Sequence, residues 1–142
     1  MTSISPKPPR GWRAIGIFLL AGSAAATLAG ITLIAPRTPV DRIWVLNPHG
    51  HTQLLTTGKF VGILFPILGV TLAAAGFGWL KVRYWGWILA VMLIGGNLLG
   101  DTIRLAQGEW LSGAVGVLLA GALFLYIISA PVRGFFRRPP ET

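Results

Sequence analysis

Four long stretches that are almost free of charge limit what this chain can fold into more than any other feature. They cover residues 14–35, 58–80, 86–107 and 111–130. The first holds 22 residues without a charged side chain. As an α-helix rising 1.5 Å per residue it would extend about 33 Å, enough to cross a hydrocarbon core of roughly 30 Å. We therefore expect an all-α fold, a four-helix transmembrane bundle that forms a single membrane domain over residues 1–142.

The composition supports a membrane protein. Charged residues make up 11% of the chain and apolar residues 54%, with a mean hydropathy of +0.70, whereas a soluble domain typically carries about 25% charged residues. The chain has no cysteine. This excludes disulfides, thiolate nucleophiles, iron–sulfur clusters and cysteine-based zinc sites.

The formal net charge of +8 comes from short basic clusters that flank the apolar stretches. Flanking positive charges set the orientation of a membrane protein and attract anionic head groups. The clusters form no basic face with interleaved aromatic residues, so we expect no nucleic-acid binding. Their members are Lys7, Arg10 and Arg13, then Lys81 and Arg83, then Arg133, Arg137 and Arg138.

The distribution of these charges predicts the orientation in the membrane. The two tails and the loop between the second and third spans carry the eight basic residues named above, and the opposite side carries at most four: Arg37, Arg42, Lys59 and Arg104. The positive-inside rule then places both termini in the cytoplasm and the long loop 36–57 outside.

The first span has a competing interpretation as a signal peptide. It has a basic front, an apolar middle and a stretch, Ala24-Ala25-Ala26, that resembles a cleavage site. The apolar run nevertheless continues to Ile34, and the apolar region of a signal peptide is shorter. We favour an uncleaved helix.

Prolines and short polar turns divide the remaining spans. Pro36 ends the first span, because proline cannot donate the next backbone hydrogen bond. The turn at 81–84 is so short that the second and third spans must form an antiparallel hairpin. Gly108 and its neighbour turn the chain again, and Pro131 ends the fourth span before a basic tail at 132–142.

The third span carries the polar group that most suggests a site. Asn97, Asp101 and Arg104 lie at positions i, i+4 and i+7, so they share one helix face. Ionisable groups within spans are costly and are often functional. Two interpretations stay open. One is an Asp101–Arg104 pair closing the outer end of the bundle, with Asn97 bonded to a neighbouring helix. The other is a polar pocket or proton-accepting site open to the outside.

His49 and His51 in the long loop are weaker candidates. Two imidazoles two residues apart can approach one metal ion, but a metal site needs three or four ligands. Asp41 and Glu109 are expected on the same side, yet no spacing requires them to contribute. We favour a structural turn around Asn47–His51 and expect no metal and no cofactor.

Small residues repeat at four-residue spacing on three spans. Such residues let helix backbones approach closely. They account for packing within the chain and would equally suit a face between copies of it. The residues are Gly22, Ala26 and Gly30 on the first span, Gly96 and Gly100 on the third, and Gly116 and Ala120 on the fourth.

The C-terminal half to two-thirds of the chain resembles small four-helix bacterial membrane proteins of unknown function. The resemblance implies a bacterial inner-membrane protein and carries no activity. It rests on the stretches Tyr84-Trp85-Gly86-Trp87-Ile88-Leu89-Ala90, Asn97-Leu98-Leu99-Gly100-Asp101, Gly113-Ala114-Val115-Gly116-Val117 and Tyr126 to Arg133.

No nucleophile–base pair, phosphate-binding glycine loop or zinc-protease signature occurs in the sequence. We therefore expect a protein that is not an enzyme. The function that the sequence favours is a non-catalytic accessory or scaffold subunit, in contact with the lipid bilayer and packing with other membrane proteins or with itself. The alternative is a small transporter or channel component that uses the polar face Asn97/Asp101/Arg104.

Overall fold

The computed structural model describes residues 7–35, 39, 42, 52 and 59–137, without the side chains of residues 59 and 61. Its helices confirm the predicted all-α fold. Four of them are long and apolar enough to cross a membrane, which makes the chain a multi-pass membrane protein. The helices are α1 (Trp12–Ile34), α3 (Lys59–Leu80), α4 (Tyr84–Ala106), α5 (Trp110–Ile128) and α6 (Ala130–Arg137).

The C-terminal segment differs from the prediction. The span expected to reach residue 130 ends at Ile128, and residues 130–137, expected to lie mostly in a basic tail, form the short helix α6. Pro131 occupies the second position of α6. At that place its missing N–H removes no intrahelical hydrogen bond, so the proline starts a helix as well as ending one.

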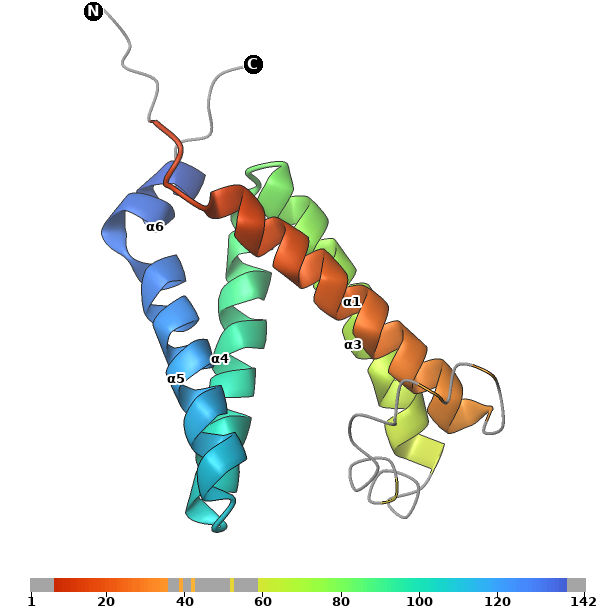
Figure 1. The fold of residues 1–142 in the computed structure, drawn as a ribbon. Coiled ribbons are helices and arrows are strands. Elements are labelled where there is room, and N and C mark those ends of the chain that lie inside the picture. Colours follow the sequence, from red (N-terminus) through yellow and green to blue (C-terminus); the bar gives the residue numbers. More distant parts are fainter. Residues whose placement is uncertain (1–6, 36–38, 40–41, 43–51, 53–58, 138–142) are drawn as a thin grey trace, which may run out of the picture.

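The four long helices form two antiparallel pairs, α1 with α3 and α4 with α5 (Figure 1). The pairs meet where α3 turns into α4 and diverge toward their opposite ends. The start of α1 and the whole of α6 lie at the end where the pairs meet. The molecule is therefore joined at one end and opened at the other.

Small residues bring α1 and α3 together. The hydroxyl of Ser23 donates a hydrogen bond of 2.7 Å to the backbone carbonyl of Gly69. Gly30 faces the ring of Pro66, and a Cβ at position 30 would lie 2.4 Å from the Pro66 Cδ. The proline within α3 is thus accommodated by a glycine on the helix it packs against.

The junction of the two pairs is a tight turn. The N–H of Arg83 bonds to the carbonyl of Gly78 at 2.8 Å, and Val82 has a left-handed φ of 53°. Gly86 of α4 then crosses Gly78 of α3, and a Cβ at position 86 would lie 2.3 Å from the Gly78 carbonyl carbon. Only glycine allows the two backbones to approach so closely.

Helix α6 covers this junction with aromatic side chains. Phe136 and Trp79 are both fully buried, with ring centroids 4.5 Å apart. Phe135 of α6 lies 5.7 Å from the ring of Trp12, and the indole N–H of Trp79 donates a 2.6 Å hydrogen bond to the Trp12 carbonyl. Most of the buried apolar side chains belong to this cluster.

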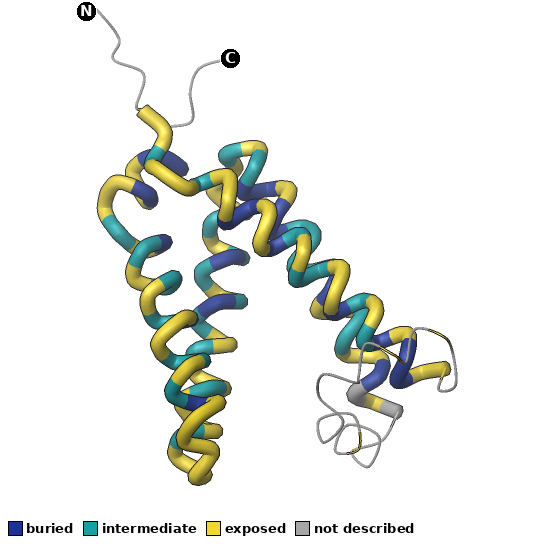
Figure 2. Tube along the Cα trace, viewed as in Figure 1, coloured by how far each residue is buried: buried dark blue, intermediate teal, exposed yellow. Residues whose placement is uncertain are grey.

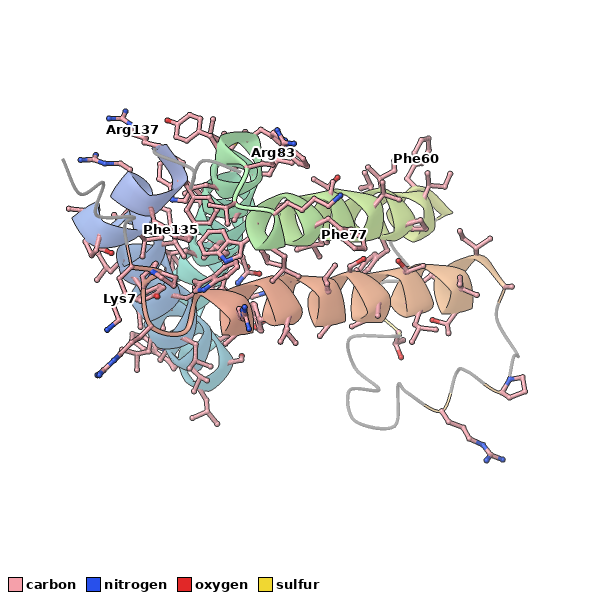
Figure 3. The ribbon with its side chains drawn as sticks, turned by 90° about the horizontal axis from the view of Figure 1, so that it is seen from above. Lys7, Phe60, Phe77, Arg83, Phe135 and Arg137 are labelled. Atoms are coloured by element: carbon pink, nitrogen blue, oxygen red, sulfur yellow. The ribbon has the colours of Figure 1, made fainter. Side chains whose placement is uncertain are left out.

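Elsewhere the helices present apolar side chains outward. Figure 2 shows exposed residues along the length of both pairs. Phe60, 83% exposed, projects away from α1 in Figure 3. Large apolar side chains on the outside of spanning helices face lipid tails, where exposure costs little.

Candidate intramembrane groove

A groove of about 880 Å³ lies between the two helix pairs. All four spanning helices contribute to its walls, and most of the lining is aliphatic or aromatic. The lining residues are Phe18, Leu19 and Gly22 from α1, Leu68 and Leu72 from α3, Met92, Leu93, Ile94, Gly96, Asn97 and Asp101 from α4, and Gly116, Leu119, Ala120 and Leu123 from α5.

Two of the three residues of the predicted polar face line this groove. The side-chain amide of Asn97 donates a 2.9 Å hydrogen bond to Oδ2 of Asp101 one turn further along α4. They are the two polar side chains among the lining residues. The helical spacing predicted their shared face, and the structure shows that this face looks into the space between the pairs.

Arg104 lies apart from these two. Its side chain is exposed and does not line the groove. Within the described residues the Asp101 carboxyl accepts the hydrogen bond from Asn97 and forms no ion pair with Arg104. The sequence left two interpretations open. The structure does not show the first of them, an Asp101–Arg104 pair.

The position of Asp101 depends on a glycine of the neighbouring helix. A Cβ at Gly116 of α5 would lie 2.5 Å from Cγ of Asp101 and 2.6 Å from Oδ2. Gly116 thus leaves the space that the carboxyl occupies. The sequence indicated Gly116 as a small packing residue, but the repeat pattern did not reveal that its neighbour is the acidic group.

A carboxyl in this position has a chemical consequence. Asp101 lies five residues before the end of α4 at Ala106, a distance of about 7.5 Å along the helix axis. The surrounding wall is otherwise apolar apart from Asn97. Acidic groups within spans usually pair with a cation or a hydrogen-bond donor, because hydrocarbon supplies neither. The groove therefore offers one acceptor group to whatever occupies it.

The weaker candidates belong to the long loop between the first two spans. His49, His51 and Asp41 lie outside the described residues. In the described part of the chain, no three His, Cys, Asp or Glu side chains come close enough to hold a metal ion.

The chain matches no protein-family model, no curated protein and no solved structure. Fold and groove define its class, a multi-pass α-helical membrane protein built from two diverging helix pairs. The resemblance to small four-helix bacterial membrane proteins stays a prediction.

Proposed function

We propose that the protein is a non-catalytic accessory or scaffold subunit whose groove receives a transmembrane helix of another protein chain. The observation that carries the proposal is the groove itself. It is largely apolar, has a volume of about 880 Å³ and lies between helix pairs that contact each other at one end. A helix placed there would contact all four spans.

The polar pair favours a protein occupant over lipid tails. Acyl chains can cover the apolar walls, but they leave the free acceptor positions of Asp101 without a donor. A transmembrane helix can supply a donor at the required depth, and interhelical hydrogen bonds of this kind contribute about 0.6 kcal/mol and up to about 1.7 kcal/mol.

Transport through this groove is the second candidate. It is favoured by the fact that Asn97 and Asp101 face the groove together. A conducting path, however, needs polar groups or water-lined constrictions along its whole depth. The lining residues supply polar side chains at one level of α4, which suits the anchoring of a partner better than the passage of a solute.

We further propose that both termini face the cytoplasm of a bacterial cell, in the inner membrane. The described basic side chains support this orientation. Seven of them belong to the segment before α1, the first turn of α1, the α3–α4 turn or α6: Lys7, Arg10, Arg13, Lys81, Arg83, Arg133 and Arg137. The two described acidic residues, Asp101 and Glu109, belong to the opposite end of α4 and the turn that follows. Fusion of a reporter that is active only in the cytoplasm to the C-terminus tests the orientation.

Photo-crosslinking in intact membranes tests the proposed function. A photoreactive side chain in place of Leu119 would point into the groove, and one in place of Leu125 would not. The two positions are matched, since both lie on α5 and are 69% and 67% exposed. We expect a defined protein adduct from position 119 and none from position 125. Lipid adducts alone at position 119 would contradict the proposal.

A further inference from the structure

Helix α4 carries two glycines that no other part of the described chain covers, and one of them, Gly96, lines the groove. Among the described glycines of the spanning helices, Gly96 and Gly100 are the two at which an added Cβ would meet nothing within 4 Å. Every other such glycine faces a neighbouring helix of the same chain at 3.8 Å or less. The packing of this chain therefore explains the small residues of the other spans but not these two.

The same helix also carries two opposite charges that do not meet each other. Asp101 follows Gly100 directly and accepts a hydrogen bond from Asn97. Arg104 lies three residues further and is exposed, and in the part of the chain that the structure describes it has no acidic partner. Asp101, the acceptor, and Arg104, the cation, are therefore less than one helical turn apart along α4.

We propose that the occupant of the groove is the α4 helix of a second copy of this chain, so that the protein is a parallel two-fold dimer. In the dimer, Arg104 of each copy pairs with Asp101 of the other. This inference rests on the proposed function, because it names the helix that the groove receives.

Symmetry makes the charge arrangement self-complementary. In a two-fold interface, if residue i of one copy contacts residue j of the other, then j also contacts i. Residues three or four positions apart commonly face each other across a parallel helix pair, so one crossing point satisfies both Asp101–Arg104 pairs. Gly96 and Gly100 lie at the four-residue spacing that lets two spanning helices cross closely. Two Asp101 carboxyls near the axis repel each other, and the two guanidinium groups offset that repulsion.

A second copy fits these observations better than another occupant. Both partners of the proposed ion pair are present on the same helix, at nearly the same depth, with the open glycine face beside them. A lipid would have to bring an ammonium group to the depth of Asp101. A different protein would have to supply a matching cation and would leave Arg104 unexplained.

Exchange of the charges tests the dimer directly. Two copies with different tags are produced together in the full chain, and their association is measured by co-purification after gentle extraction. Arg104→Asp and Asp101→Arg, each alone, place like charges across the interface. We expect each substitution to weaken self-association by about tenfold. A change of that size lies within the free energies measured for polar contacts between spanning helices. An Arg104→Asp copy and an Asp101→Arg copy together restore both opposite-charge pairs, so we expect the mixed dimer to form as the native dimer does.

A second variant avoids position 101, because the Asp101 side chain packs on α5 and its replacement could disturb the fold. A Cβ at position 100 would meet no atom of its own chain within 4 Å. We therefore expect Gly100→Leu to leave the fold intact while abolishing the dimer. Val115→Phe is the matched control, since it adds bulk to a half-exposed position of α5 outside the groove at similar depth. Failure of the mixed charge variants to associate, or a native dimer with Gly100→Leu, overturns the inference.

The crosslinking described above separates the two proposals. An adduct between two copies at position 119 agrees with both. An adduct with a different protein overturns the dimer and leaves the proposed function standing. Absence of any protein adduct overturns both.

Discussion

The carboxyl of Asp101 in α4 lies against Gly116 in α5, so close that a Cβ at position 116 would lie 2.5 Å from the Asp101 Cγ. This contact fixes the position of Asp101, which is the only acidic side chain within the spanning helices in the described part of the chain. It also couples the chemistry of the groove to the packing of α4 on α5, because the carboxyl cannot move toward α5 and is kept at the groove wall.

Gly116→Ala tests this coupling. The new methyl group would clash with the carboxyl, and overpacking typically costs about 1–3 kcal/mol. We expect the free energy of unfolding, measured by denaturation in detergent micelles, to fall accordingly. In an Asp101→Ala background the clash disappears, so there the same substitution should stabilise the helix by up to about 1 kcal/mol, the usual gain from glycine to alanine. Gly121→Ala on the same helix, where the nearest atom is 3.8 Å away, is the control and should not destabilise. Equal losses in both backgrounds would contradict the coupling.

Gly86→Ala should disrupt the junction of the two helix pairs. The added Cβ would lie 2.3 Å from the Gly78 carbonyl carbon and 2.5 Å from the Trp79 nitrogen, and these backbone atoms cannot rotate aside. We expect a loss of at least about 3 kcal/mol, at the upper end of overpacking effects, together with a change in tryptophan fluorescence as Trp79 becomes exposed. Gly22→Ala, with its nearest atom at 3.8 Å, should leave both readouts unchanged. A native-like Gly86→Ala protein would show that the close crossing is not required.

Sequence reasoning predicted the elements well, because span length and the exclusion of charge from lipid depend on local sequence alone. It missed α6 because Pro131 is compatible with the end of one helix and the start of the next. It placed Asn97 and Asp101 on one face, since helical periodicity fixes that relation. It could not show which helix the face meets. The contact of Asp101 with Gly116 and the groove itself arise from how two hairpins are joined at residues 81–83, which is tertiary information.

Phe136→Ala should detach α6 from the bundle. The Phe136 ring is buried against Trp79 with centroids 4.5 Å apart, and removal of a buried phenylalanine side chain typically costs about 3–5 kcal/mol. We expect lower stability in detergent and faster proteolysis at Arg133 and Arg137, which α6 holds in helical form. Phe60→Ala removes the same side chain from a position that is 83% exposed, so it should have little effect. Similar losses from both substitutions would indicate that α6 contributes no more than a lipid-facing residue.

Tyr126→Phe should loosen the chain before α1 without unfolding the bundle. The Tyr126 hydroxyl donates a hydrogen bond to the backbone carbonyl of Arg10, which ties the N-terminal segment to the end of α5. Loss of one such bond costs about 1 kcal/mol, and the ring itself remains in place. We expect trypsin to cleave after Arg10 several times faster, while the unfolding transition of the whole protein shifts little. Cleavage at Lys81, in the α3–α4 turn, serves as the internal reference, because that turn is held by its own backbone hydrogen bonds, including the one from the Arg83 N–H to the Gly78 carbonyl. If both sites became equally sensitive, the hydroxyl would be stabilising the whole end of the bundle, and the local role assigned to it here would be wrong.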